Sequence, residues 1–517
     1  MARDEESKFP GTTTDRQIRN LSKSKLLAFR QCSKRLWLEV HRPDLREETS
    51  DTETRFRIGH EVGEIAQRLY DPNGLGTVVD AQAEGFGPAL ARSTALLASS
   101  APVFEAGFAA EGALAFADIM LPVGSEPKPT WRMVEVKSSA SVKDYHRDDI
   151  AIQAFVALAA GVSLDSIALA HIDSGWLYPG NDNYQGLLIE NDFTDEALKR
   201  GGEVRAWIGE AHAVVQKPSE PQIRTGTHCL NPYECSFRTY CQSQEPRPEH
   251  PVEWLPRLQA RAVKNLIETK AIKDLRDVPD EYLNDLQRRV KAQTLLDKPF
   301  FDQTGAAAEL AQYTLPACFL DFETIQFAVP IWKGTRPYQQ LPYQFSRHGL
   351  SPTGELDHSE FLDLSGDDPS APFAEALIAA CGQVGPIFVY HAGFEAARIM
   401  ELADRFPRLE RPLLAINERL VDLLPVARRH YYHPAQQGSW SIKSVLPTVA
   451  PDLSYDKLVG VQDGTMATTA YLEAVHPQTA PARKDKIRRQ LLDYCSLDTY
   501  ALVRLWKYFA GRNDIRM

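Results

Sequence analysis

Apolar and polar positions alternate along the first half of the chain in a way that predicts interleaved helices and strands. Helical spacing covers residues 21–41, where Ser22 or Ser24 is the predicted N-cap, and then 54–70, 86–99 and 148–161. Strand patterns cover 104–123, predicted as a hairpin that turns at Gly112, and then 131–139 and 167–174. This order predicts an α/β domain built on a mixed sheet.

The proline-rich segment 243–256, SQEPRPEHPVEWLP, marks the predicted boundary of this first domain, which we place at 21–242. Residues 243–314 are predicted to form a helical connector, because 257–314 are helical in pattern throughout. The polar residues 1–20 lack the apolar core of a signal peptide and are predicted to be a disordered lead-in.

A second α/β pattern fills the predicted domain 315–517. Its predicted strands lie at 316–327, 341–350, 361–364 and 386–391. Its predicted helices lie at 371–382, 394–406 and 484–510.

Composition places the chain among soluble globular proteins, with 43% hydrophobic and 25% charged residues. No apolar run approaches the roughly 18 residues of a membrane span, so we expect a cytoplasmic protein without a membrane partner. The net charge of −11 does not favour tight, non-specific nucleic-acid binding. A negative net charge is still compatible with a metal-dependent nuclease, because such an enzyme binds metal ions with carboxylates and its substrate with a local basic groove.

Several acidic residues of the second domain fall where strands meet helices. Asp321 and Glu323 are two apart on a predicted strand end, so both side chains point to one face. Two such carboxylates repel each other unless a cation lies between them, although two solvent-exposed acids are the simpler alternative. Glu395 opens the helix after the strand PIFVY, and Tyr494 and Asp498 are four apart on one face of the last helix.

This order resembles the RNase H-like DEDD exonucleases, in their tyrosine-containing branch. More closely, the segment resembles an uncharacterised bacterial family in which this fold follows a RecB-like nuclease domain. The strings that carry the resemblance are FLDFETIQFAVP, GTRPYQQLPYQFS, YHAGFEAARI, RLVDLLPVARRHYYHP, GSWSIKSVLP and DYCSLDTYALVRL.

The resemblance implies that two divalent ions, Mg²⁺ or Mn²⁺, are held by Asp321, Glu323 and Asp498. Glu395 stands where the superfamily has Asp, as a further metal ligand, and Tyr494 would orient the attacking water. Three more residues are candidates for a supporting role. His391 stands where such motifs commonly have Asn. Asp422 is either an acid that supports the metal ligands or a helix or strand cap. Lys443 either contacts a substrate phosphate or is a solvated lysine.

The first domain carries a second set of acidic and basic residues. Asp118 ends one predicted strand, and Glu135 and Lys137 share a face of the next. Two carboxylates can bind a metal while the lysine offsets developing charge, and a surface salt bridge is the simpler alternative. Gln153 follows on the next helix.

The order Asp, Glu-x-Lys, Gln resembles the RecB-like branch of the PD-(D/E)XK nucleases, whose fold is restriction-endonuclease-like. The resemblance implies that Asp118 and Glu135 bind a metal ion and that a histidine from an early helix assists. His60 is the candidate for that histidine, with unusual spacing. Ala157 stands where such enzymes commonly have Tyr.

Three of the seven cysteines lie within thirteen residues, at Cys229, Cys235 and Cys241. Thiolates gathered this closely in a leaderless chain are typical metal ligands. Together with Cys32, their layout resembles that of the iron–sulfur RecB-like nucleases, which implies a four-iron four-sulfur cluster, with zinc as the alternative. Cys318, Cys381 and Cys495 have apolar surroundings and are predicted core residues.

These patterns together predict a metal-dependent nuclease that hydrolyses DNA or RNA, acting on a single strand or a strand end. The resemblance implies 3′–5′ exonuclease polarity for the C-terminal domain. Two alternatives stay open. One is a nucleic-acid-binding scaffold with one or both sites decayed, and the other is an RNA-processing exonuclease.

Overall fold

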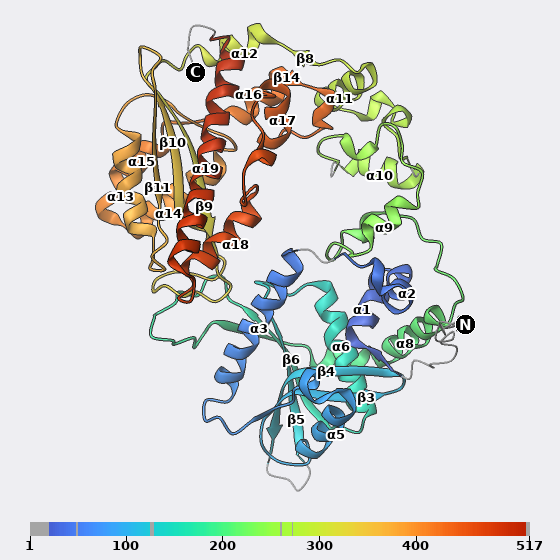
Figure 1. Ribbon diagram of the computed structural model, residues 1–517. Coiled ribbons are helices and arrows are strands. Elements are labelled where there is room, and N and C mark those ends of the chain that lie inside the picture. The colour runs from blue at the N-terminus through green and yellow to red at the C-terminus, as the bar shows by residue number, and fades with distance from the viewer. Residues whose placement is uncertain (1–19, 48–49, 125–128, 259–260, 271, 513–517) are drawn as a thin grey trace, which may run out of the picture. The chain divides into compact units, whose positions relative to one another are not determined.

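The computed structural model describes residues 20–47, 50–124, 129–258, 261–270 and 272–512, so the predicted disordered lead-in lies outside the described residues apart from Asn20. The chain divides into two compact units. The first comprises Met1–Glu245 and Ala328–Pro337, and the second comprises Pro246–Phe327 and Tyr338–Met517. Both are mixed α/β structures, as the sequence predicts (Figure 1).

A seven-stranded mixed sheet forms the centre of the first unit in the described part of the chain. Its order is β2-β3-β4-β5-β6-β7, with β1 beside β4. The pairs β2–β3, β5–β6 and β1–β4 are parallel, and the other pairs are antiparallel. The strands are β1 (Leu21–Ser22), β2 (Thr77–Val78), β3 (Val103–Ala110), β4 (Ala113–Val123), β5 (Thr130–Lys137), β6 (Leu164–Ile172) and β7 (Leu188–Asp192).

Helices cover both faces of this sheet. The face of Met133 packs against α1, α6 and α8, and the face of Val134 packs against α3. Glu135 is two residues after Met133, so it points toward α1 and α6. The helices are α1 (Lys23–Gln31), α2 (Ser33–His41), α3 (Ser50–Tyr70), α4 (Ala81–Glu84), α5 (Phe86–Leu96), α6 (Asp144–Ala159), α7 (Thr194–Lys199), α8 (Gly201–Val215) and α9 (Arg238–Ser243).

The single helix predicted for 21–41 is two helices. Cys32 adopts an extended conformation, with φ −164° and ψ 124°, and separates α1 from α2. The apolar periodicity continues across this residue, so the sequence pattern does not show the break. Ser22 caps α1 as predicted, because its Oγ accepts a hydrogen bond from the Lys25 backbone N at 3.4 Å. Leu21 and Ser22 themselves form the short strand β1.

The predicted hairpin is confirmed. β3 and β4 pair from Val103↔Met120 to Ala110↔Ala113, and Gly112 makes the turn with φ 81°. β4 continues to Val123, however, so Asp118 lies inside the strand and not at its end.

A five-stranded mixed sheet forms the centre of the second unit, in the order β11-β10-β9-β12-β13. β11, β10 and β9 are antiparallel neighbours, and β12 is parallel to both β9 and β13. β8 and β14 form a separate antiparallel pair. The strands are β8 (Phe300–Phe301), β9 (Ala317–Ile325), β10 (Leu341–Leu350), β11 (Leu356–Leu362), β12 (Ile387–Val389), β13 (Leu420–Asp422) and β14 (Tyr431–Tyr432).

The two faces of β9 pack against different helices. Phe319 lies in the core that contains α16, α17 and α19, whereas Leu320 packs toward α13, α14 and α15. The long helix α19 runs beside β9 and β10 in Figure 1. The helices are α13 (Ser370–Cys381), α14 (Gly393–Arg405), α15 (Glu410–Asn417), α16 (Leu423–His430), α17 (Ile442–Val449), α18 (Gly464–Val475) and α19 (Pro481–Ala510).

The segment predicted as a helical connector belongs to the second unit from Pro246 onward. It contains α10 (Arg261–Lys270), α11 (Asp285–Leu296) and α12 (Gln303–Leu310), with two short 3₁₀ turns between α10 and α11 and the strand β8 between α11 and α12. It is therefore less continuously helical than predicted. A new helix, α11, begins after Asn284, whose side chain forms a capping box with Gln287. The helical pattern of 257–314 is therefore divided at this residue.

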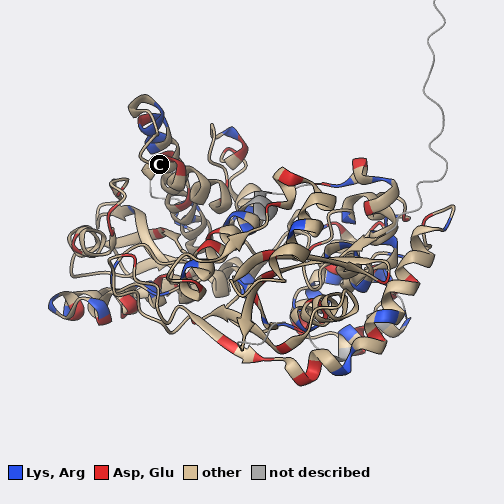
Figure 2. Ribbon diagram, turned by 90° about the horizontal axis from the view of Figure 1, so that it is seen from below, with Lys and Arg blue, Asp and Glu red and all other residues tan. Residues whose placement is uncertain are grey.

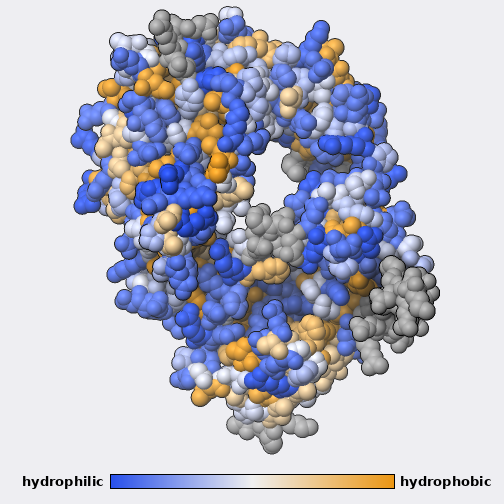
Figure 3. Space-filling model, in the orientation of Figure 1, coloured by the Kyte–Doolittle hydropathy of each residue, from blue (hydrophilic) through white to orange (hydrophobic). Residues whose placement is uncertain are grey.

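Acidic and basic residues are interspersed along the helices, as the ribbon in Figure 2 shows, in keeping with the modest net charge. The face seen in Figure 3 is mainly hydrophilic, with apolar residues scattered among polar ones. Within the described ranges, no helix has both the length and the apolar character that crossing a membrane requires.

Candidate functional site

Three carboxylates of the second unit converge on one point. Single ligand oxygens of Asp321, Glu323 and Asp498 all lie within 4.8 Å of one another. Asp321 and Glu323 point to the α19 face of β9, as their two-residue spacing predicts, and Asp498 meets them from α19. β9 extends to Ile325, so the pair lies within the strand and not at its end as predicted.

Hydrogen bonds from β10 fix the register of α19 behind this cluster. Thr499, next to Asp498, bonds through its Oγ1 to Ser346 Oγ at 2.7 Å and to His348 Nδ1 at 2.8 Å. Gln344 Nε2 donates to the Leu491 carbonyl at 2.8 Å. Ser346 and Gln344 pair with Asp321 and Glu323 in the sheet. The partner strand of the two acids therefore also holds the helix that supplies the third.

Burial raises the pKa of all three carboxylates, and neighbouring carboxylates add to the effect at Asp321 and Glu323. Burial raises the pKa of Asp321 well above its usual range, and the charges of Asp498 and Glu395 add to this. Burial, followed by the charge of Asp498, raises the pKa of Glu323 to about 8. Burial also raises the pKa of Asp498 to about 6, although a hydrogen bond from Tyr455 opposes the rise. A bound cation would relieve this repulsion, and hard carboxylate oxygens are the ligands that Mg²⁺ and Mn²⁺ prefer.

Glu395 lies in the first turn of α14 and is buried, with 2% of its surface exposed. Its Oε2 atom is buried without a hydrogen-bond partner in the part of the chain that the structure describes. Burial raises the pKa of Glu395 to about 8, with a smaller contribution from the charge of Asp422. Glu395 is close enough to raise the pKa of Asp321, but it is not part of the compact group of three.

Asp422 is the last residue of β13, and its side chain makes two contacts with backbone atoms. Its Oδ1 accepts hydrogen bonds from Leu424 N, which caps α16, and from His391 N, each at 2.9 Å. His391 has a left-handed backbone with φ 74°. Asn and His tolerate this region better than most residues do. His391 is therefore compatible with the backbone conformation at this position.

Two tyrosines and a lysine border the carboxylates. The Tyr455 hydroxyl donates to Asp498 Oδ1 at 2.5 Å. Lys443 Nζ lies 5.0 Å from the centre of the Tyr455 ring and 5.3 Å from that of Tyr494, and it donates to the Gln462 carbonyl at 2.9 Å. The lysine charge lowers the pKa of both Glu323 and Asp498. Tyr455 was missed in the sequence because it lies 43 residues before Asp498 and shares no pattern with it.

A recess of about 510 Å³ lies in the second unit. Tyr390 and His391, the two residues that follow β12, line it. Two arginines, Arg257 and Arg428, and two serines, Ser439 and Ser441, also line it. Ser441 caps α17, the helix that carries Lys443. The recess thus offers cationic and hydroxyl groups beside the segments that carry the carboxylate site.

The predicted residues of the first unit also come together. Asp118 Oδ2 accepts a hydrogen bond from the Val136 backbone N at 2.7 Å, which joins β4 to β5. Lys137 Nζ donates to Glu135 Oε1, and Gln153 Nε2 donates to Glu135 Oε2. Burial raises the pKa of Asp118 well above its usual range, and the charge of Glu135 adds to it.

Two residues at this site were missed in the sequence analysis. Asp149 lies one turn before Gln153 on α6, and its spacing of four was a usable signal. Lys23 comes from the start of α1, 112 residues from Glu135, and no local pattern points to it. Burial acts to lower the pKa of Lys23, but the charges of Asp149 and Glu135 outweigh it and raise this pKa.

His60 lies on α3 with an exposed ring, and its Nε2 is 3.2 Å from Glu64 Oε1. Its charge lowers the pKa of Glu105, whose own pKa is raised by burial and by Glu135. His60 is therefore within electrostatic reach of the rim of this site and is paired with a neighbour on its own helix. Among the described residues, only the three carboxylates of the second unit bring three candidate ligand atoms within 4.8 Å of one another, so the acids of the first unit are less tightly gathered.

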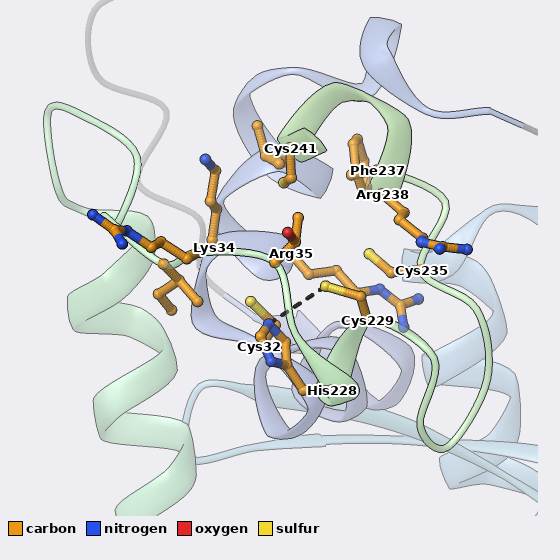
Figure 4. Close-up of a pocket in the computed structure, with 13 residues that line it drawn as sticks. Cys32, Lys34, Arg35, His228, Cys229, Cys235, Phe237, Arg238 and Cys241 are labelled. Carbon is orange, nitrogen blue, oxygen red and sulfur yellow. Dashed lines mark hydrogen bonds between the residues drawn. The ribbon is translucent and has the colours of Figure 1, made fainter. Parts of the chain in front are cut away.

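All four predicted cysteine ligands line one pocket of the first unit (Figure 4). Cys32 enters from the break between α1 and α2, while Cys229, Cys235 and Cys241 come from the segment that ends in α9. Burial raises the pKa of Cys229 and Cys235, and raises that of Cys241 to about 11. The set supplies four thiols from two distant segments, which suits a four-cysteine cluster or zinc once the thiols are deprotonated.

Gln31, the residue before Cys32, ties these two segments together. Its Nε2 donates to the backbone carbonyls of His228 at 2.9 Å, Asn231 at 3.3 Å and Tyr233 at 2.8 Å. Lys34, Arg35 and Arg238 also line the pocket, so positive charge surrounds the sulfur atoms. The remaining cysteines, Cys318, Cys381 and Cys495, are buried core residues, as predicted.

Comparison with known proteins gives a match to part of the second unit and to the segment Ala328–Pro337 of the first unit. No curated protein matches the sequence significantly. Residues 318–441 match the family model described as a domain of unknown function, DUF2779, a span that includes Asp321, Glu323, Glu395 and Asp422 and ends before Tyr494 and Asp498.

Proposed function

We propose that the chain is a metal-dependent nuclease whose phosphodiester hydrolysis takes place in the second unit. The observation that carries the proposal is the convergence of Asp321, Glu323 and Asp498, whose ligand oxygens lie within 4.8 Å of one another. Burial, with neighbouring carboxylate charge at Asp321 and Glu323, raises their pKa values, so the ionised form of the cluster is unfavourable without a bound cation. A site for two divalent cations explains why such a cluster is built.

Asp321, Glu323 and Asp498 would hold Mg²⁺ or Mn²⁺, with Glu395 completing the set from α14. The bound ions would supply Lewis acidity and a water of lowered pKa. Tyr494 then orients the attacking water, and Tyr455 holds Asp498 through its hydroxyl. Lys443 and the arginines of the adjoining recess would receive the substrate phosphates. The resemblance to DEDD exonucleases supports an RNase H-like fold and 3′–5′ polarity.

We propose that the first unit is a RecB-like domain with a restriction-endonuclease-like fold. Asp118 and Glu135 would bind a divalent ion, with Lys137 and Gln153 beside it. The four cysteines would hold a four-iron four-sulfur cluster, with zinc as the alternative. The proposed partner is DNA or RNA with a single-stranded segment or an end, and the proposed location is the cytoplasm.

The test uses anaerobically purified full-length protein, end-labelled single-stranded DNA and RNA, and Mg²⁺ or Mn²⁺. Wild type is compared with Asp321→Asn, Glu135→Gln and the double variant. Glu355→Gln, an exposed acid of the β10–β11 turn, is the matched control. We expect cleavage to be lost in Asp321→Asn and kept in Glu355→Gln. An absorbance band near 400 nm, a general feature of iron–sulfur clusters, would separate such a cluster from zinc.

Other outcomes would support other assignments. Loss of cleavage in Glu135→Gln alone would place phosphodiester hydrolysis in the first unit. Preference for RNA in competition would favour the RNA-processing exonuclease. No cleavage by the wild type on any substrate, with the cysteine-bound metal present, would favour the nucleic-acid-binding scaffold.

A further inference from the structure

The metal site proposed for the first unit contains an ammonium group that the nuclease resemblance does not account for. Lys23 Nζ lies 3.0 Å from Glu135 Oε1 and 3.0 Å from Asp149 Oδ1. Lys137 Nζ donates to the same Glu135 oxygen and to the other oxygen of Asp149. Two acids and two lysines thus alternate around a closed ring of ion pairs.

The position of Lys23 is fixed by the fold. Leu21 pairs with Ala113 in the sheet, and its backbone N donates to the Gly112 carbonyl at 2.9 Å. Ser22 then caps α1, so Lys23 is the first residue of the helix. The side chain is largely buried, with 21% exposed, and both of its acidic partners are almost fully buried, at 1% and 4%. This is a built contact and not a surface ion pair that solvent screens.

The charges around this ring limit how many cations the site can accept. When all three are ionised, Asp118, Glu135 and Asp149 carry three negative charges, and Lys23 and Lys137 carry two positive charges. Glu135 Oε1 already receives both ammonium groups, and its Oε2 receives Gln153. Asp118 has one oxygen, Oδ1, outside the hydrogen bond that it accepts from Val136. Asp149, by contrast, has both oxygens committed to lysines.

We propose that Lys23 takes the place of a second divalent cation, so that the site of the first unit binds a single metal ion. This inference rests on the proposed metal-dependent function of that unit. The Lys23 ammonium neutralises Glu135 and Asp149 on the side where a second ion would sit. The single ion binds at Asp118 Oδ1 beside Glu135, and Lys23 acts as a positioning residue that holds the carboxylates of Glu135 and Asp149.

The test measures the stoichiometry of Mn²⁺ binding to the full-length chain by electron paramagnetic resonance and calorimetry. The parent carries Asp321→Asn, Glu323→Gln and Asp498→Asn, which remove three of the four carboxylates proposed to bind metal in the second unit. Lys23→Met and Lys23→Gln are added to it separately, because the glutamine keeps a hydrogen-bond donor if the methionine perturbs folding. Lys25→Met, two residues along α1 and without an ion-pair partner among the described residues, is the control.

We expect the parent and Lys25→Met to bind one Mn²⁺ in the first unit and both Lys23 variants to bind two. Adding Asp149→Asn to Lys23→Met should remove the second ion and leave the first. Binding of one Mn²⁺ with unchanged Kd in both Lys23 variants would overturn the inference and leave the proposed function intact. If neither the parent nor the variants bind Mn²⁺, the inference falls together with the metal-dependent function of the first unit.

Discussion

The Tyr455 hydroxyl donates a hydrogen bond of 2.5 Å to Asp498 Oδ1, across 43 residues of sequence. The bond fixes the orientation of one of three convergent carboxylates and lowers its pKa, against the larger effect of burial. Tyr455 is itself 8% exposed, and burial with the charge of Asp498 raises its pKa far above the usual range. The hydroxyl therefore acts as a permanent donor to the carboxylate and not as a base.

Replacing Tyr455 with Phe should weaken divalent-metal binding at the carboxylates of the second unit. Asp498 would lose its orienting donor, its pKa would rise further, and the ionised form that binds metal would be less favoured. Groups that orient metal ligands typically change affinity by about 10–100-fold, and we expect a loss in this range by Mn²⁺ titration. Tyr471→Phe is the matched control, because that buried hydroxyl has no hydrogen-bond partner among the described residues. An equal effect in both variants would contradict a specific role for Tyr455.

The metal-free protein should lose stability as the pH rises from about 5 to about 8. Glu323 and Glu395 each have a folded pKa of about 8, against an ordinary value of 4.5. A group with a raised pKa binds more protons in the folded state, so its contribution is greatest at low pH and is lost as the pH rises through the folded value. Thermal unfolding at several pH values, with a chelator and with Mg²⁺, measures this. We expect Mg²⁺ to raise the Tm most at the highest pH.

Glu323→Gln is the informative variant in this pH series, since it removes one raised pKa without changing the size of the side chain. Its Tm should fall less steeply with pH than that of the wild type, and Mg²⁺ should raise it less. A Tm that stays level or rises over the same interval in the metal-free wild type would refute the expectation.

Thr499→Val should destabilise the second unit and weaken its metal site together. The change removes hydrogen bonds to Ser346 and His348, both buried, and leaves their polar atoms without this partner. Such a loss costs about 1–3 kcal/mol of unfolding free energy, which denaturant titration would detect. Because Thr499 sets the register of α19, the Kd for Mn²⁺ should rise as well. Thr469→Val, at an exposed position of α18, should change neither quantity.

Gln31→Leu should loosen the cysteine pocket of the first unit. Three backbone carbonyls of the segment that carries Cys229 and Cys235 would lose their shared donor. We expect a chelator to remove the bound metal more readily from this variant. The metal affinity should fall by about tenfold, as is typical when a group that orients metal ligands is lost. Iron and zinc content after purification and chelator treatment measures this. Gln242→Leu, an exposed glutamine next to Cys241, is the control. Retention of metal equal to the wild type would show that the thiols alone hold the pocket together.

Much of the secondary structure follows from local pattern. The strand predicted for 341–350 has the observed bounds, and the two-residue spacing of Asp321 and Glu323 correctly predicts a shared face. These features depend on alternation and on turn residues such as Gly112, which act over a few positions. The break at Cys32 was missed because the apolar periodicity continues through it.

The parts of the sites that the sequence could not predict come from tertiary contacts. Lys23 reaches Glu135 from the start of α1, and Tyr455 reaches Asp498 from a 3₁₀ turn. Neither residue has a spacing or a neighbour that points to its partner. Their roles depend on sheet pairing and on helix packing, which only the assembled fold defines.

The ten residues Ala328–Pro337, which interrupt the second unit between β9 and β10, belong to the first unit. Tyr178 exchanges backbone hydrogen bonds with Gly334 and Thr335 of this segment, and Val329 and Trp332 within it are buried. The polypeptide therefore passes between the units three times. A cut near Pro246 would not yield two independent modules, because the C-terminal fragment would carry apolar side chains deprived of their packing partners. Proteolytic dissection, gene splitting or domain exchange would have to treat this insertion as part of the N-terminal unit.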